Sequence, residues 1–322
     1  MKHLLIVNPA SGVVSKHKLV PLICHLLREK GIDYDIVFTK APGHGHELAR
    51  EASAKGYGAV IACGGDGTVN EIASGLTGTD TVLGIIPTGS GNGLARHVGI
   101  PIDLARSISI IAAGNTVKAD YGMANGNPFF CTFGVGFDAA VSERCAREKR
   151  RGILMYLRNV INEYIKFRPE EYTIEVDGKV ITERAFLVVC CNASQYGNNA
   201  FIAPTASITD GELDVTIVHT GNLIAQAIAG LDILTGLIRR NAFVDVFRAS
   251  SLKIKRKSEG SGHVDGDAVK LPEEIEVVCC PAALNLFAPT KSTSFRPIIT
   301  PVTLFFRDLG LAIRHLLPGE RQ

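Results

Sequence analysis

The stretch IACGGDGTVNEIASGL, residues 61–76, decides the fold of the first part of the chain. It leads from an apolar strand through three glycines and one aspartate, Asp66, directly into a helix. Backbone N–H groups at a helix start attract anions, and a carboxylate beside them should repel a phosphate. Asp66 therefore makes sense if a metal ion, or a hydroxyl that loses its proton, lies between the carboxylate and the phosphates. The stretch predicts nucleotide chemistry rather than nucleotide storage.

Around this stretch, apolar strands alternate with helices. The periodicity predicts strands at residues 4–8, 34–39, 59–63 and 82–87, and amphipathic helices at 18–31 and 45–56. Continuous apolar strands separated by helices indicate a parallel sheet that is covered on both faces. In such sheets ligands bind beyond the carboxyl ends of the strands. Those ends read NPASG, TKAPGHG, GGDGT and PTGSGNG, so four polar or glycine-rich loops are predicted at one edge.

From about residue 118 the pattern changes to strands without intervening glycine-rich loops. YTIEVDGKVI predicts a hairpin that turns at Asp177–Gly178. Further strands are predicted at AFLVVCCNAS, LDVTIVHT, SLKIKRK and EIEVVCC. Helical stretches are expected at roughly 142–167 and 222–240. The second part of the chain is therefore expected to be a mainly β domain.

Composition narrows the class of protein. A chain of 322 residues is long enough for two modest domains, and a formal net charge of +2 gives no reason to expect nucleic-acid binding. The cysteine pairs Cys190–Cys191 and Cys279–Cys280 each end a strand, where neighbours point to opposite faces. They are predicted to be buried thiols of a reducing cytosol. No run of about 18 apolar residues is present, so no transmembrane helix is expected.

Four motifs in order, NPASG, GGDGTVNE, PTGSGNGLA and DGELDV followed by HVDGDA, resemble the diacylglycerol kinase catalytic-domain family, which includes bacterial lipid kinases, sphingosine kinases and ceramide kinases. The resemblance covers roughly residues 1–290. It implies an α/β fold with a Rossmann-like parallel-sheet domain that binds ATP at 1–118, joined by 281–290. It also implies a sandwich-like β domain for the lipid at 119–280, with the active site in the cleft between the two. Residues 291–322 would form a C-terminal amphipathic extension.

The ATP contacts that the resemblance implies lie in the four loops. Asn8, Ser11 and Gly12 form a polar turn suited to an adenosine moiety, although a plain turn after a strand explains them equally well. Bare backbone at a glycine loop allows phosphates to approach closely, and polar groups at the helix start add donors. The full set predicted to bind the nucleotide is Asn8, Pro9, Ser11, Gly12, Thr39, Gly64, Gly65, Asp66, Gly67, Thr68, Asn70, Glu71, Ser90 and Asn92.

Phosphoryl transfer needs positioning, charge neutralisation and a proton acceptor. Asp66 is predicted to hold magnesium, and the resemblance implies that Asp120 joins it through water. The HVDGDA turn carries two carboxylates. The family usually has glutamate at the position of Asp267 and assigns the general base there. Because the aspartate is one methylene shorter, Asp265 is the alternative base.

Two further sites rest on the resemblance. In TDGELDV, Asp210 and the backbone carbonyls of Leu213 and Val215 would hold a second, structural magnesium ion, since hard cations prefer oxygen ligands. A plain turn before a strand is the simpler explanation. Asp138 matches the sphingosine-kinase position at which an aspartate contacts the lipid headgroup.

Two segments suggest contact with a bilayer. Basic residues at 147–151 precede a helix with an apolar stripe, which suits either an anionic membrane or ordinary packing. In the C-terminal segment the apolar residues fall on one helical face: Val302, Phe305, Phe306, Leu309, Ile313, Leu316 and Leu317. This face is expected to lie on the bilayer, pack on the fold or form a homodimer contact.

Together these features predict an ATP- and magnesium-dependent lipid kinase, cytoplasmic and peripheral at the inner face of a membrane, that phosphorylates a diacylglycerol-, sphingoid- or ceramide-like hydroxyl. An NAD kinase-like enzyme with a soluble acceptor is the alternative enzyme. A catalytically silent regulator that binds lipid or nucleotide is the alternative from another class. The sequence does not distinguish between acceptor lipids.

Overall fold

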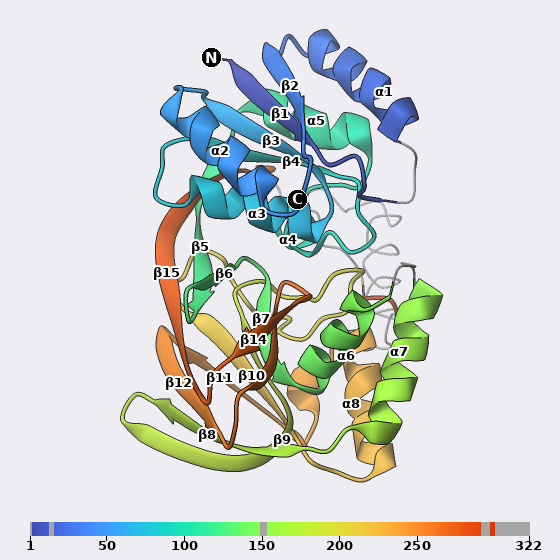
Figure 1. Ribbon diagram of the computed structural model, residues 1–322, viewed down its shortest axis with the longest axis vertical. Coiled ribbons are helices and arrows are strands. Elements are labelled where there is room, and N and C mark those ends of the chain that lie inside the picture. Colours follow the sequence, from blue (N-terminus) through green and yellow to red (C-terminus); the bar gives the residue numbers. More distant parts are fainter. Residues whose placement is uncertain (1, 13–15, 149–152, 291–296, 300–322) are drawn as a thin grey trace, which may run out of the picture.

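The computed structural model describes residues 2–12, 16–148, 153–290 and 297–299. Two lobes lie one above the other in Figure 1, with the N-terminal elements in the upper lobe. The upper lobe contains four parallel strands, β1 (His3–Val7), β2 (Tyr34–Phe38), β3 (Ala59–Gly64) and β4 (Val82–Pro87). They are ordered β4–β3–β1–β2, which confirms the predicted parallel sheet.

Helices cover both faces of this sheet. They are α1 (Lys16–Glu29), α2 (His44–Ala54), α3 (Asp66–Leu76), α4 (Gly93–Val98) and α5 (Leu104–Ala113). Alternate residues of each strand enter different cores: Ile6 packs with α2 and α3, whereas Leu5 packs with α1 and α5. Both faces of β3 are apolar for this reason, and the strand is buried from end to end. The loops that follow β1, β3 and β4 therefore meet at one edge of the sheet.

The lower lobe is mainly β. Its strands are β7 (Thr132–Gly136), β8 (Glu170–Val176), β9 (Lys179–Cys191), β10 (Leu213–His219), β11 (Val244–Ala249), β12 (Ser251–Arg256), β13 (Gly260–Val264) and β14 (Asp267–Leu271). All their pairings with one another are antiparallel. The predicted hairpin turn is confirmed, since Asp177 and Gly178 both have positive φ, 49° and 74°.

Three helices pack in the lower lobe, α6 (Phe137–Ala146), α7 (Ile153–Lys166) and α8 (Leu223–Thr235). The single helical stretch predicted at 142–167 was wrong, because α6 begins at Phe137 and ends at Ala146, and α7 begins only at Ile153. The stretch predicted at 222–240 was too long. Gly236 has a φ of 73° and ends α8, and a short 3₁₀ turn follows at Ile238–Arg240.

Two strands connect the lobes, β5 (Thr116–Ala124) and β15 (Glu274–Phe287), which pair with each other along most of their length. β15 pairs with β12 in the lower lobe and reaches β4 of the upper lobe at Leu286. The short strand β6 (Asn127–Phe129) pairs with β5. Figure 1 shows β15 running along one side of the molecule from one lobe to the other. One hydrogen-bonded sheet therefore passes through both lobes.

The cysteines behave partly as expected. All eight are free thiols. Cys190 and Cys191 are fully buried in different cores, which agrees with neighbours on opposite faces of a strand. Cys279 and Cys280 are only partly buried, so the prediction of burial was wrong for this pair. Within the described ranges, no helix is long and apolar enough to cross a bilayer.

Candidate active site

Two glycine loops meet backbone against backbone at the carboxyl ends of β3 and β4. A side chain on Gly89 would overlap the Cα atom of Gly65, and one on Gly64 would overlap the Thr68 side chain. Only glycine allows the chain to pass at these points. As a result, backbone without side chains lies beside the start of α3, where N–H groups favour an anion such as phosphate.

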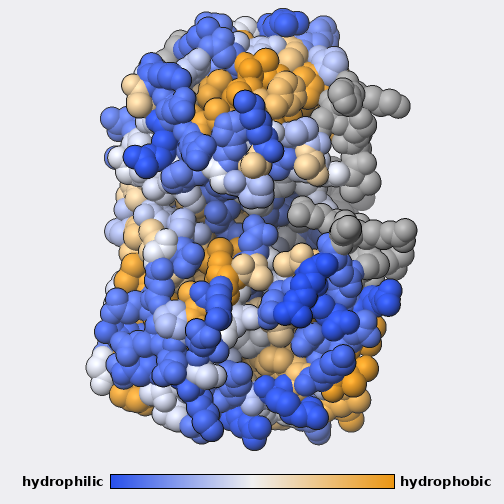
Figure 2. Space-filling view, in the orientation of Figure 1, coloured by the Kyte–Doolittle hydropathy of each residue, from blue (hydrophilic) through white to orange (hydrophobic). Residues whose placement is uncertain are grey.

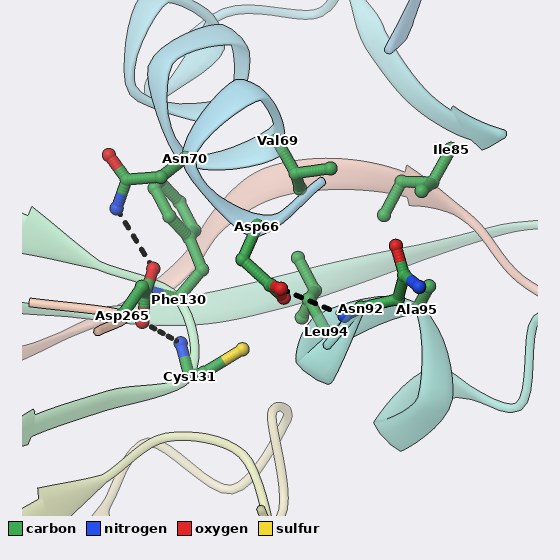
Figure 3. Close-up of a pocket in the computed structure, with 10 residues that line it drawn as sticks. All are labelled: Asp66, Val69, Asn70, Ile85, Asn92, Leu94, Ala95, Phe130, Cys131 and Asp265. Atoms are coloured by element: carbon green, nitrogen blue, oxygen red, sulfur yellow. Dashed lines mark hydrogen bonds between the residues drawn. The ribbon is translucent and has the colours of Figure 1, made fainter. Parts of the chain in front are cut away.

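Asp66 joins these two loops (Figure 3). Its carboxylate accepts hydrogen bonds from the backbone N–H groups of Asn92, at 2.8 Å, and Gly93, at 2.6 Å. Burial raises the pKa of Asp66, although these two hydrogen bonds oppose the shift. A side chain on Gly91 would lie 2.6 Å from the Asp66 carboxylate, so the second loop wraps closely around it. The Asp66 carboxylate thus holds the second glycine loop against the first.

Asp66 retains the capacity to bind a magnesium ion. Each carboxylate oxygen can accept about two hydrogen bonds or ligand contacts, and each oxygen of Asp66 takes one from the backbone. Asp66 also lines a small cavity with Asn70, Asn92 and Asp265 (Figure 3). Among the described residues, no three acidic, histidine or cysteine side chains gather to hold a metal alone. A magnesium ion here would therefore share Asp66 with substrate phosphates, as is usual for this cation.

Asp265 is fully engaged. Its carboxylate accepts hydrogen bonds from the Asn70 side chain at 2.8 Å and from three successive backbone N–H groups, those of Phe130, Cys131 and Thr132, at 2.9, 2.7 and 3.0 Å. Four donors use the acceptor positions of a carboxylate. The contact ties α3 of the upper lobe to the link between β6 and β7. Asp265 is therefore placed to hold the turn rather than to remove a proton.

Asp267 has a different environment. It is the first residue of β14, its side chain is exposed, and a methyl group added to Gly67 would lie 3.1 Å from its Oδ2 atom. The carboxylate from the lower lobe thus faces the glycine loop of the upper lobe at the position where that loop has no side chain. This position favours Asp267 over Asp265 as the proton acceptor.

The first loop of the sheet closes onto the same edge. The Asn8 side chain donates to Thr68 Oγ1 at 2.9 Å and accepts from the Ala10 N–H. Ser11 is buried and donates to the Asn8 carbonyl. Pro9 and Gly12 are exposed beside them. Their positions suit nucleotide binding, and that role stays a prediction.

Other residues predicted to bind nucleotide support the loops. Glu71 accepts hydrogen bonds from the N–H groups of Gly43, at 2.8 Å, and Gly45, at 2.9 Å, so it holds the start of α2. Asn92 closes its own loop, with its side chain bonded to both backbone groups of Gly89. Thr39 donates its backbone N–H to Val7, next to the end of β1. Ser90, between the glycines, is exposed.

Asp120 lies in another environment. It is 3 % exposed, and its carboxylate accepts hydrogen bonds from the N–H groups of Gly211 and Ala282, both at 2.7 Å. The described hydrogen bonds of this carboxylate do not join it to Asp66. They connect the turn at residues 209–212 to the irregular part of β15. The predicted water bridge between Asp120 and Asp66 thus has no support from these contacts.

The predicted second metal site contains an arginine. The Arg248 guanidinium lies 3.5 Å from Asp210, 3.5 Å from Asp214 and 4.0 Å from Glu212. Leu213 and Val215, whose carbonyls were expected to bind the ion, lie in β10, which pairs with β9 and β11 on its two sides. The guanidinium thus lies against these three carboxylates and offsets part of their charge. With Arg248 in this position, the residues as arranged do not fit a resident magnesium ion.

Asp138, predicted to contact the lipid headgroup, makes contacts inside the lower lobe. It lies in the first turn of α6 and accepts a hydrogen bond from the Tyr196 hydroxyl at 3.0 Å, and its carboxylate lies 2.9 Å from His263 Nε2. Residues 149–151 of the basic run predicted to meet a membrane lie outside the described residues. The C-terminal amphipathic segment, residues 300–322, also lies outside them.

Sequence reasoning missed two residues of α4 that join the lobes. Arg96 donates to the Gly91 carbonyl at 2.9 Å and to the Asn199 side chain at 3.1 Å. His97 Nδ1 accepts the Ser194 N–H at 3.1 Å, and burial lowers the pKa of His97 to about 4. The only signal in the sequence was an Arg–His pair directly after the second glycine loop. These contacts hold that loop against residues 194–199.

Comparison with known proteins agrees with the two-lobe arrangement. Residues 2–124 match the diacylglycerol kinase catalytic domain, and residues 131–288 match the YegS C-terminal NAD kinase beta sandwich-like domain. The diacylglycerol kinase of Mycobacterium tuberculosis is 33 % identical over 302 residues, which cover 88 % of this chain and 93 % of that protein. The diacylglycerol kinase of Bacillus subtilis is 27 % identical over 82 % of this chain and 88 % of that protein.

A crystal structure of a diacylglycerol kinase from Bacillus anthracis str. Sterne has the same fold. It aligns with a TM-score of 0.73 at 23 % identity and covers 91 % of this chain and 98 % of that one. The N-terminal match includes the glycine loops of the candidate site, and the relatives are diacylglycerol kinases. The chain belongs to the diacylglycerol kinase catalytic-domain family and is a lipid kinase.

Proposed function

We propose that this lipid kinase uses ATP and magnesium to phosphorylate the hydroxyl of a diacylglycerol-, sphingoid- or ceramide-like lipid. The observation that carries the proposal is the exposed carboxylate of Asp267, which faces the glycine loop at Gly67 from the opposite lobe. The arrangement offers a phosphate-binding backbone on one side and a proton acceptor on the other. The active site is thus proposed to lie between the lobes.

The backbone at Gly65 and Gly67 binds phosphate oxygens, and Asp66 holds the second loop in place while its free acceptor positions serve magnesium. Magnesium, when bound, neutralises charge on the phosphates. Asp267 orients the lipid hydroxyl and accepts its proton as the oxygen attacks the γ-phosphorus, while the bond from the γ-phosphorus to the bridging oxygen breaks and ADP leaves. Charge neutralisation and alignment are the main demands of phosphoryl transfer, and this site supplies both.

Transfer of label from [γ-³²P]ATP tests the proposal directly. The protein is incubated with magnesium and, in separate reactions, diacylglycerol, a sphingoid base, ceramide, undecaprenol or NAD. A labelled phospholipid is the expected product. Labelled NADP would favour the NAD kinase-like alternative, and no labelled product in any reaction would favour a silent binding protein.

We also propose contact with a membrane, at its cytoplasmic face, where ATP is available. α8 supports this proposal because its outer side chains are apolar and exposed: Leu223 at 65 %, Ile224 at 68 %, Ile228 at 49 % and Leu231 at 49 %. Figure 2 shows apolar residues gathered at the lower right, where α7 and α8 lie in Figure 1. Exposed apolar patches of this kind mark interaction surfaces.

Vesicle sedimentation tests the membrane contact. Replacing Leu223 and Ile224 by serine should reduce binding to phosphatidylglycerol vesicles and leave activity on a short-chain lipid in detergent unchanged. Deletion of residues 300–322 tests the second apolar segment in the same way. Equal sedimentation of both variants and the wild-type protein would contradict this part of the proposal.

A further inference from the structure

A buried polar cluster lies directly behind the Asp265–Gly266–Asp267 turn. His263 is 1 % exposed, and its Nε2 atom lies 2.9 Å from the Asp138 carboxylate, which also accepts the Tyr196 hydroxyl. A side chain on Gly134 would overlap Asp138 and meet His263 Nε2 at 2.6 Å. The cluster therefore fits only because β7 has glycine opposite His263, with which it pairs in the sheet.

The other nitrogen of His263 reaches the turn itself. The Gly266 N–H points to His263 Nδ1 at 3.4 Å. A backbone N–H can only donate, so Nδ1 accepts and carries no proton. The proton of the neutral ring is then on Nε2, where it is donated to Asp138. The ring thus connects a buried carboxylate to the peptide group between Asp265 and Gly266, one residue before Asp267.

The turn is held from two sides. On the first side Asp265 receives its four donors, and its own N–H donates to the Thr132 carbonyl at 2.8 Å. On the second side Gly266 is exposed and has a φ of 88°, a conformation that glycine adopts without strain. The pairing of Val264 with Asp267 fixes the two ends of the turn, and the described hydrogen bond of the Gly266 N–H inside the turn is the one to His263. Asp267 follows Gly266 immediately.

We infer that His263 is a positioning residue for the proton acceptor: Asp138 orients the ring, and the ring orients Gly266 and so the Asp267 carboxylate. This inference rests on the proposed function, because it presupposes that Asp267 acts on the lipid hydroxyl. It gives Asp138 a task inside the lobe instead of at the lipid headgroup. A displacement of about 1 Å at a reacting group can cost as much as 100-fold in rate, so a restraint at this peptide matters for turnover.

Two substitutions at one position separate the two nitrogens. Asparagine places its amide oxygen near the position of Nδ1, so His263→Asn keeps the acceptor for Gly266 and loses the contact with Asp138. Glutamine places its terminal amide near Nε2, so His263→Gln keeps the donor to Asp138 and loses the acceptor for Gly266. Tyr196→Phe is the matched control, because it removes a donor to Asp138 and leaves His263 and Gly266 in place.

For the full-length protein, kcat and the lipid KM are measured with ATP, magnesium and the lipid that the wild-type protein phosphorylates. His263→Gln should lower kcat about tenfold or more with little change in KM, and His263→Asn should lose less than about threefold. Tyr196→Phe should retain nearly all activity. Equal kcat losses in both His263 variants at unchanged melting temperature would overturn the inference. A rise in lipid KM on Asp138→Asn, with kcat unchanged, would assign Asp138 to the headgroup and overturn it as well.

A second measurement does not depend on activity. Hydrogen exchange at the Gly266 amide should be faster in His263→Gln than in the wild-type protein and in His263→Asn. If the wild-type protein phosphorylates no lipid, the proposed function fails, and exchange at Gly266 still decides whether His263 restrains the turn. Unchanged exchange in His263→Gln would show that it does not.

Discussion

Two Asp–Gly turns of the lower lobe look alike in sequence and serve different ends. At VDGDA, Asp265 is surrounded by N–H donors from Asn70 and residues 130–132, and the second carboxylate, Asp267, remains exposed beside the glycine loop. At TDGELDV, the carboxylates surround the Arg248 guanidinium, and the turn is tied to buried Asp120. The first turn lies where the lobes meet, and the second joins β10 to β15.

The difference shows that the function of an acidic turn depends on which groups contact its carboxylates: backbone N–H groups in the first turn and an arginine in the second. Backbone N–H groups hold one carboxylate of the first turn without adding a cation, and its neighbour, Asp267, is exposed at the glycine loop. An arginine offsets part of the charge of the second turn and lies against its carboxylates, so a metal ion there would have to compete with the guanidinium.

The largest effect is expected for Asp265→Asn. The new amide nitrogen would face N–H donors and leave at least one of them unpaired, which costs about 1–3 kcal/mol for a buried group. Melting temperature and activity should therefore fall together, with kcat reduced about 100-fold because the turn that carries Asp267 is displaced. Thermal unfolding and steady-state kinetics measure the two effects. A normal melting temperature would contradict the view of Asp265 as the anchor of the turn.

Asp66→Asn should lower turnover by about 100-fold with a smaller loss of stability. The amide oxygen still accepts one of the N–H groups of Asn92 and Gly93, but the charge that favours magnesium is gone. The magnesium concentration needed for half-maximal rate should rise. Wild-type activity at low magnesium would rule out this role for Asp66.

The contact between the lobes should weaken in acid because of His97. Burial lowers the pKa of His97 in the folded state to about 4, below its unfolded value. The unfolded chain then binds a proton first as the pH falls from about 6.5 towards 4, so stability is lost over this range, by up to about 3 kcal/mol. His97→Asn keeps an acceptor for Ser194 and does not titrate. Denaturant unfolding from pH 7 to pH 4 should show a flatter profile for this variant, and identical profiles would exclude His97 as the cause.

The smallest effect is expected at the second turn. Arg248 is 43 % exposed, so Arg248→Met should cost only about 1 kcal/mol or less, because solvent screens ion pairs of this kind. Addition of EDTA should leave the melting temperature of the wild-type protein unchanged. A clear drop with EDTA that magnesium reverses would show that a metal ion does bind at Asp210, and the contrast between the turns would disappear.

The upper lobe could be predicted well from the sequence. The strand expected at 82–87 is β4 with the same bounds, since a buried parallel strand is a continuous apolar run that ends at a glycine loop. The lower lobe was harder. β13 and β14 were not predicted, because each has only five residues and β13 contains two glycines.

The candidate site was predictable in its residue types and only partly in its roles. Motif spacing placed Asp265 and Asp267 together in one turn. It did not show which carboxylate is exposed, because the donors to Asp265 come from Asn70, 195 positions away, and from the link between β6 and β7. His263 and Asp138 are 125 positions apart, so their contact also depended on the fold. Long-range partners of this kind leave no periodic signal in the sequence.

The central claim is that Asp267, presented to the glycine loop from the other lobe, accepts the proton of the lipid hydroxyl. The most direct test is kcat for Asp267→Asn and Asp267→Glu on the same lipid, together with apparent ATP affinity and melting temperature. The side chain is exposed, so both variants should fold normally. Asp267→Asn should lower kcat about 100-fold or more with little change in ATP affinity, and Asp267→Glu should retain activity. Near wild-type kcat in Asp267→Asn would contradict the claim.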